Sequence, residues 1–327
     1  GSNAGRNIST GNQNTLIGGL AGDALTSSNV NVAVGYAALT TDTLGTRSTA
    51  LGYATLFAQN FATLTNADNV AIGYNASTST TTGIENVIIG AQAGDALTDA
   101  DYNVAVGKSA LGADTLGSRS TAIGYGALTL QNFTTATDAY NTAVGFQAGL
   151  NVTTGTGNTL IGGQAGDAIT TGQDNVTLGY RAGTYQANLT TGDGNVLIGP
   201  YNDPTDGTDD FAHGLGYNLN CAGDYTTLGQ GNSDIRAAHG NITWATVSDQ
   251  RYKKDIVDST AGLSFINALT PRTFKYKTLG ELPETFRAYE ADSTKVFKNS
   301  NTNHGFIAQE VKAAIDADSS IKDGFRL

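Results

Sequence analysis

A short alternation of polar and apolar positions recurs through the first two thirds of the chain. Each copy reads [Asn/Ser]-x-[Ala/Leu/Ile/Thr]-[Val/Ile/Leu]-Gly, and the spacings between successive copies are 17, 17, 21, 17, 17, 17, 21, 17, 17 and 20 in sequence number. The eleven copies begin at Asn14, Asn31, Ser48, Asn69, Asn86, Asn103, Ser120, Asn141, Asn158, Asn175 and Asn195. Internal repeats of this length are typical of solenoids, in which each repeat stacks on its neighbours.

Each repeat is too short for a helical hairpin, and its apolar run of three or four residues fits one short β-strand. Side chains alternate along a strand, so Val32 and Val34 are predicted to share one face and Ala33 the other. We expect the Val and Ile residues to fill the interior of the coil and the small residues to face outward. The Gly after each strand permits a bend with positive φ, and the Asn before it is expected to form a ladder.

A longer block groups the repeats, because the pattern that starts at Asn14 restarts at Asn86 and again at Asn158. The two spacings of 21 contain the inserted segments LFAQNFATLTNAD and LTLQNFTTATDAY. These segments are expected to bulge as loops on one side. Phe57, Phe61 and Phe133 in them are either the candidates for a recognition surface or buried anchors of the loops.

The pattern decays after residue 200. GLGYN and YTTLGQG, within residues 201–247, indicate degenerate repeats in an irregular β connector. Signals of an α+β unit follow in residues 248–327: a helix containing Leu263, Ile266 and Leu269, a strand at RTFKYK, and a strand leading into a helix at HGFIAQEVKAAI. Residues 1–9 are interpreted as a tag or leader, residues 10–200 as the β-roll shaft or head, and the chain as a fragment truncated near its C-terminus.

Composition and charge narrow the functional classes. The chain has 42 Gly, 4 Pro and one Cys, Cys221, which is expected to be a small buried apolar residue. Residues 1–247 carry 6 Lys and Arg against 18 Asp and Glu, a net charge of −12, which argues against binding to nucleic acid. No run of 18 apolar residues occurs, so no insertion into a membrane is expected.

Metal and cofactor sites are not expected either. The carboxylates Asp203, Asp206, Asp209 and Asp210 lie close together, but their spacing fits no calcium loop, and a solvated acidic turn is the preferred interpretation.

The repeats NVAVGYAAL and STAIGYGAL resemble the head repeats of trimeric autotransporter adhesins. The resemblance covers about residues 10 to 200 and implies a mainly β fold, a trimeric left-handed parallel β-roll or solenoid. It implies that the chains trimerise through the small-residue face. The wider spacing of the repeats in this chain departs from that family.

The segments SDQRYK, GLSFINALTPRTFKY and HGFIAQEV resemble, in this order, the C-terminal intramolecular chaperone domain of phage endosialidases and tail fibres. The resemblance implies that residues 248–327 assist trimer assembly and then cleave themselves off at Val247–Ser248. Ser248 would be the nucleophile and Lys253 its base, because a hydroxyl needs a base, and a Lys serves only when its pKa is depressed. His304 is a candidate helper or a structural hydrogen-bonding residue.

These features favour a homotrimeric tail fibre or spike on a virion, with a host-surface glycan or protein as receptor and a self-cleaving serine endopeptidase as its one candidate activity. Alternatives are a cellular trimeric adhesin with the same repeats and a glycan-degrading fibre whose catalytic site is not evident here. Ser248 could instead cap a helix, with Lys253 solvated.

Overall fold

The computed structural model describes residues 1–231, 233–240, 245–246, 263–286 and 288–317. The chain separates into two compact units, Gly1–Val247 and Ser248–Leu327. The first is a β-solenoid of about 13 turns, and only 6% of the structure is helical, so the predicted mainly β class is confirmed. The hand of the coil and the trimer stay predictions.

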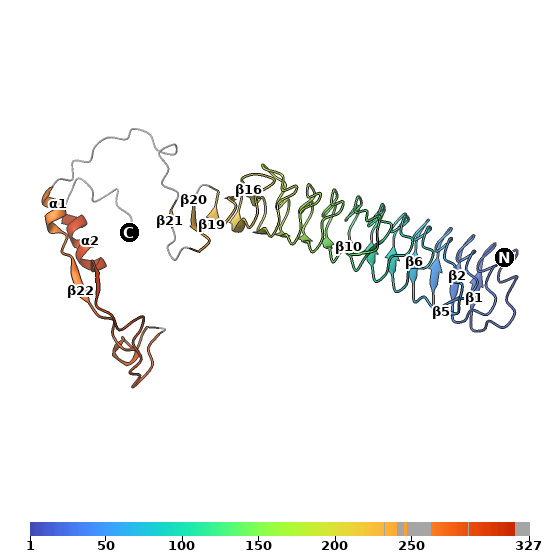
Figure 1. Cartoon of the computed structure of the whole chain (residues 1–327), viewed down its shortest axis with the longest axis horizontal. Coiled ribbons are helices and arrows are strands. Elements are labelled where there is room, and N and C mark those ends of the chain that lie inside the picture. The colour runs from blue at the N-terminus through green and yellow to red at the C-terminus, as the bar shows by residue number, and fades with distance from the viewer. Residues whose placement is uncertain (232, 241–244, 247–262, 287, 318–327) are drawn as a thin grey trace. The chain divides into compact units, whose positions relative to one another are not determined.

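One long parallel sheet runs along the solenoid, with one strand from each coil (Figure 1). Each of the eleven predicted repeats forms a strand of three residues that pairs in register with the strand before it. The eleven strands are β1 Thr15–Ile17, β2 Val32–Val34, β4 Thr49–Leu51, β6 Val70–Ile72, β7 Val87–Ile89, β8 Val104–Val106, β10 Thr121–Ile123, β12 Thr142–Val144, β13 Thr159–Ile161, β14 Val176–Leu178 and β15 Val196–Ile198.

The predicted faces of these strands are wrong. The middle residue of each strand points into the coil, and the flanking branched residues point outward: Ala33 is 0% exposed, whereas Val32 is 37% exposed. The interior is narrow and is already filled from the opposite wall by residues such as Leu39. In coils where such a large residue lies opposite the strand, only a small strand side chain fits beside it at interior packing density.

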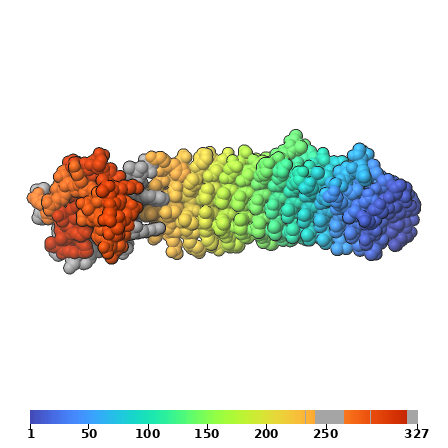
Figure 2. All heavy atoms as spheres, turned by 90° about the horizontal axis from the view of Figure 1, so that it is seen from below, coloured from blue at the N-terminus to red at the C-terminus, as the bar shows by residue number. Residues whose placement is uncertain are grey.

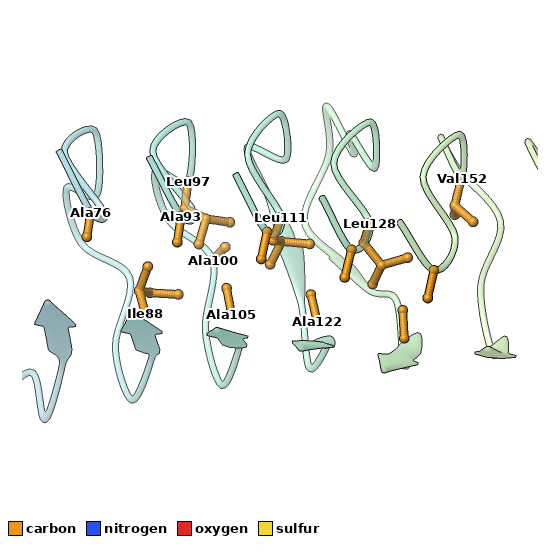
Figure 3. Packing of buried hydrophobic residues seen from close by; sticks show 14 of the residues in the cluster. Ala76, Ile88, Ala93, Leu97, Ala100, Ala105, Leu111, Ala122, Leu128 and Val152 are labelled. Carbon is orange, nitrogen blue, oxygen red and sulfur yellow. The ribbon is translucent and has the colours of Figure 1, made fainter. Parts of the chain in front are cut away.

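Large and small residues alternate across the coil. Where the middle strand residue is Ala105 or Ala122, the opposite wall supplies Leu111 or Leu128, and all four side chains are buried. Where the strand supplies Ile88, the residue opposite is Gly94, and a Cβ there would lie 3.2 Å from Ile88 Cδ1. Figure 3 shows Ile88 rising from its strand, while Leu111 and Leu128 descend from the far wall. These coils thus reach a similar filled volume by different routes.

The predicted Asn ladder is confirmed and is buried. Asn31 Oδ1 accepts a hydrogen bond from the backbone N–H of Ser48 at 2.8 Å, and Asn31 Nδ2 donates to the carbonyl oxygen of Gly45 at 3.0 Å. The Asn31 backbone N–H donates in turn to Oδ1 of Asn14. An unpaired buried amide costs roughly 1–3 kcal/mol, so the ladder fixes where each coil turns into its strand.

Two steps of the ladder hold Ser in place of Asn, and the inserted segments complete them. At Ser48, the Gln59 side chain from the first insert donates to Ser48 Oγ at 3.1 Å and to Asp42 Oδ2 at 2.7 Å, and it accepts from Asn69 Nδ2 at 2.9 Å. Gln131 repeats all three contacts in the coil of Ser120. The inserts are therefore built into the interior, and they also project from the surface in the light blue and green parts of Figure 2.

The phenylalanines of the inserts divide between the two predicted roles. Phe61 and Phe133 are 5% and 6% exposed, so both are anchors of their loops. Phe57 is 43% exposed and remains a surface residue.

The solenoid continues beyond the eleven repeats. β17 (His213–Tyr217) and β19 (Tyr225–Gln230) add two more parallel strands, so the degenerate repeats are confirmed. The chain then reverses, and β20 (Ser233–Ala238) and β21 (Ala245–Thr246) pair antiparallel on the last coil. Cys221 is buried, as predicted, in β18 (Asn220–Cys221), which pairs with β16 (Asp203–Pro204).

Three two-stranded parallel ribbons accompany the long sheet. Besides β16 with β18, β3 (Gly45–Thr46) pairs with β5 (Thr65–Asn66), and β9 (Gly117–Ser118) pairs with β11 (Thr137–Asp138). The last two ribbons hold the inserts against the coil before them.

The Asp-rich turn is partly buried, contrary to the solvated turn predicted for it. Asp206 is exposed and Asp209 is partly exposed, and both bond their own turn. Asp203 is buried, and its carboxylate accepts from the backbone N–H groups of Tyr185 at 2.9 Å and Gln186 at 2.7 Å. Burial raises the Asp203 pKa from 3.8 to about 6.

Asp203 should make the solenoid more stable in mild acid. The pKa of Asp203 is higher in the folded chain than in the unfolded chain. Its contribution to the free energy of unfolding is therefore fully present below pH 3.8 and is lost as the pH rises through about 6. A change of about two pKa units corresponds to at most about 3 kcal/mol. Urea unfolding between pH 4 and pH 8 should show it, and Asp203→Asn should remove this part of the pH dependence. An unchanged pH dependence in the variant would contradict the assignment.

Candidate functional site

The C-terminal unit contains the elements that its sequence predicts. α1 (Leu263–Ala268) ends shortly before Pro271, and β22 (Arg272–Phe274) pairs antiparallel with β23 (Asn303–Gly305). α2 (Ala308–Ala317) follows β23, and the 3-10 helix η2 (Leu279–Glu281) lies between the strands in sequence. The predicted helix, strand and strand–helix segments are therefore present, but Leu269 lies just beyond the end of α1, and Ile266 of its predicted apolar stripe is exposed.

An ion pair joins the start of β22 to α2. The Arg272 guanidinium donates through Nε and Nη2 to the two carboxylate oxygens of Glu310, at 3.0 and 2.8 Å. This contact raises the pKa of Arg272 and lowers that of Glu310. Both side chains are half exposed, so the pair orients the elements more than it stabilises the unit.

The apolar side chains of this unit are largely on its surface. Among the described residues of the unit, the buried apolar ones are Leu279 and Ile315, whereas several large apolar side chains are exposed. The exposed ones are Ile266, Phe286, Phe297, Phe306 and Ile307. Such exposure of large apolar side chains is typical of a surface that another chain covers.

The proposed catalytic residues are only partly in view. Ser248 and Lys253 lie outside the described residues, so the dyad stays a prediction. His304 is described: it lies in the middle of β23, opposite Thr273 of β22, with its side chain exposed. An imidazole there is open to contact from another segment or another chain.

The comparison with protein families agrees with the position of this unit. Residues 248–318 match the family model for the chaperone of endosialidase. The match begins at the residue predicted to be the nucleophile, and it spans the described elements of the unit. No curated protein and no solved structure matches the chain. The likeness of the repeats to adhesin heads therefore stays a prediction, while the chaperone-of-endosialidase domain is identified.

The described part of the chain contains neither a grouping of metal ligands nor a helix that could span a membrane. Within residues 1–231, 233–240, 245–246, 263–286 and 288–317, no three His, Cys, Asp or Glu side chains are grouped so that they could hold a metal ion. Neither α1 nor α2 is long and apolar enough to cross a membrane.

The outer face of the solenoid sheet is a second candidate site. The sequence interpretation placed the trimer contact on an outward face of small residues, which is wrong, because small residues such as Ala33 lie inside the coil and branched residues form the outer face. Each parallel strand places one outward-facing residue in register with Ile17, and these residues form one apolar column from β1 to β19. The column consists of Ile17, Val34, Leu51, Ile72, Ile89, Val106, Ile123, Val144, Ile161, Leu178, Ile198, Leu215 and Leu228. It is most open near its two ends, with Ile17 58% and Leu215 55% exposed.

Proposed function

We propose that the chain is one subunit of a homotrimeric viral tail fibre or spike, in which the β-solenoid is the shaft or head and the chaperone-of-endosialidase domain directs trimer assembly. The outer apolar column is the observation that carries this proposal. Twelve strand spacings of about 4.8 Å make the column roughly 60 Å long. A soluble single chain rarely exposes so extended an apolar strip, and three parallel copies around one axis would bury it.

The chaperone domain explains why assembly needs assistance. Three identical columns have no lateral feature that fixes their relative height, because consecutive coils present similar Val, Ile and Leu residues. A shift by one coil would bury almost as much apolar surface. A domain that trimerises at one end would align the three chains before the columns close.

Removal of the domain after assembly is the proposed activity of Ser248 and Lys253. Lys253 takes the proton of the Ser248 hydroxyl, and the oxygen attacks the carbonyl carbon of Val247. The peptide C–N bond breaks, the released Ser248 amine takes a proton, and water then hydrolyses the ester. The attack needs no substrate binding, because the chain itself holds the two groups together.

Intact mass of the full-length product tests the cleavage. We expect a cut between Val247 and Ser248, and we expect Ser248→Ala and Lys253→Ala each to abolish it, because one removes the nucleophile and the other its base. Lys254→Ala is the matched control and should leave the cut in place. A single uncut mass for the wild-type full-length chain would contradict the protease role and leave the chaperone role to be judged separately.

Sedimentation tests the trimer. The wild-type solenoid should sediment as three copies, and Ile123→Asp, which places a charge in the middle of the apolar column, should reduce it to single chains. A wild-type solenoid that stays a stable single chain would contradict the proposed fibre. A virion location and recognition of a host surface follow from the fibre role.

A further inference from the structure

A second column on the solenoid surface is aromatic. It is formed by the residue that follows the strand-ending Gly in each coil, and consecutive members stack on one another. Tyr36, Tyr53 and Tyr74 have ring centroids 5.6 and 5.3 Å apart, and Tyr125 stacks on Phe146 at 5.5 Å. Offset stacks of this kind are favourable, and here they leave ring edges and open end faces exposed.

The column is interrupted in each of the longer blocks that begin at Asn14, Asn86 and Asn158. Up to Tyr217, the positions without a ring are Gly19, Ala91, Lys108, Gly163 and Pro200, and the Tyr201 ring lies between those of Tyr180 and Tyr217 at the last of them. At Gly163 the gap lies between two rings, Phe146 and Tyr180, which are 54% and 49% exposed. One position of the stack is therefore empty, with a ring on either side.

The size of this gap follows from the backbone. Gln164 N–H donates to the Phe146 carbonyl oxygen at 2.8 Å, and Arg181 N–H donates to the Gly163 carbonyl oxygen at 3.0 Å, so the three coils keep the regular spacing. Two spacings place Phe146 and Tyr180 roughly 10 Å apart. One six-membered ring stacked at about 5 Å from each aromatic ring fills that distance. Gly163 is the floor of the slot, and a Cβ there would lie 3.4 Å from Tyr180 Cδ2.

The residues near the slot in sequence differ in character. Ile161 of the apolar column precedes Gly163 by two residues, and the half-buried Gln164 and Arg181 directly follow Gly163 and Tyr180 in sequence. Arg181 Nη2 donates to the Thr184 carbonyl oxygen at 3.4 Å, and its guanidinium lies 5.3 Å from the centre of the Tyr185 ring; a guanidinium has five N–H groups, so further ones can be donated to a ligand. An aromatic side chain in the slot would offer no hydrogen-bond acceptor to the Gln164 amide or to the Arg181 guanidinium. A sugar ring has apolar C–H faces for the two aromatic rings and hydroxyl groups at its edge for these donors.

We propose that the slot formed by Phe146, Gly163 and Tyr180 binds a pyranose ring of a saccharide, with Gln164 and Arg181 as hydrogen-bonding partners. Arg181 is one of only six Lys and Arg residues in the first 247, so it is a rare positive charge on an acidic surface. Neutral and acidic sugars share the ring that the slot recognises, and an acidic sugar would add a charge contact to Arg181. The proposal rests on the proposed role of the fibre in recognising a host surface, and it names the ligand class for that role.

The test fills the slot with a ring of the protein itself. Gly163→Tyr completes the aromatic column, and Gly163 does not have a positive φ, so the variant should fold with an unchanged or higher melting temperature. Binding is measured on a printed array of glucose, galactose, mannose and galacturonic acid oligosaccharides, followed by calorimetry with the oligosaccharides that bind. Gly163→Tyr should weaken binding by at least about tenfold, which is about 1.4 kcal/mol. Arg181→Ala should weaken acidic oligosaccharides more than neutral ones.

Thr154→Tyr is the matched control, because it adds a tyrosine at an exposed position between Phe146 and Gly163 in sequence. It should leave binding unchanged. The proposal is overturned if the wild-type chain binds no sugar on the array, or if Gly163→Tyr binds as well as wild type. It is also overturned if Gly163→Tyr changes the sedimentation of the assembly, since the slot would then hold a side chain of another copy. Cleavage and trimer formation are measured separately, so failure here leaves the proposed fibre intact.

Discussion

Gly107→Ala is expected to disrupt the middle of the solenoid. Gly107 ends strand β8 with a φ of +136°, a conformation that is almost restricted to glycine. A Cβ there would collide with the carbonyl oxygen of Gly124 in the next coil and would lie 2.6 Å from its carbonyl carbon. Both contacts are to backbone atoms of a stacked strand, so neither can move without shifting every following coil. We expect a loss on the order of 4 kcal/mol or more.

Circular dichroism during urea unfolding would measure this loss, and limited proteolysis would show whether cleavage begins near β8. Gly112→Ala is the matched control, because it lies five residues further on without a positive φ, and its nearest neighbour would be the Ser109 carbonyl oxygen at 3.3 Å. The control should lose much less stability. Equal stability of Gly107→Ala and wild type would mean that the strand-ending glycines are not required by the stacking.

Gln59→Ala is expected to have the next largest effect. Gln59 is fully buried, and its removal leaves the Asp42 carboxylate, the Ser48 hydroxyl and the Asn69 amide without one partner each. We expect a loss of about 3 kcal/mol, because several buried polar groups lose hydrogen bonds together. Burial raises the pKa of Asp42, and the bond from Gln59 opposes that effect. The loss should therefore be greater in alkali, where the Asp42 carboxylate is charged, than in acid.

Urea unfolding of wild type and variant in acid and in alkali measures this difference. Asn60→Ala is the control, because Asn60 is the neighbouring residue of the insert, is exposed, and its side chain accepts a hydrogen bond only from Thr43 in the described part of the chain. It should cost well under about 1 kcal/mol. A similar small cost for Gln59→Ala would show that water replaces the glutamine and that the insert does not complete the ladder.

The register of the solenoid was predictable because each coil repeats the same few requirements. The Asn of each ladder step and the Gly that ends each strand recur at the spacing of the coils, and both have the predicted roles. The inward and outward faces were not predictable from alternation alone, since a strand at 32–34 can turn either of its two alternating sets of side chains toward the interior. A signal was present nevertheless. The pair Ala105 and Leu111 is small then large, and the pair Ile88 and Gly94 is large then small, with an offset of six residues between the members of each pair. Such an exchange indicates that the two positions share one interior.

The candidate sites also differ in whether the sequence alone could predict them. The motif around Ser248 identified the chaperone-of-endosialidase domain from the sequence, because its three segments are specific in order and content. The outer apolar column and the aromatic slot could not be found by motif. Phe146, Gly163 and Tyr180 belong to three consecutive coils and become neighbours only when these coils stack.

The sequence by itself determined the solenoid, the number and spacing of its repeats, the ladder and the start of the C-terminal domain, because these depend on local patterns within one coil or one motif. The tertiary structure decided which strand face is buried, what the inserts do and which surface residues gather into columns. Those features depend on the width of the coil, since a narrow interior admits only the middle side chain of each strand and turns the two flanking residues outward. Gln59 illustrates the division: the sequence places it in an inserted loop, and only the stacked coils bring it to the missing step of the ladder.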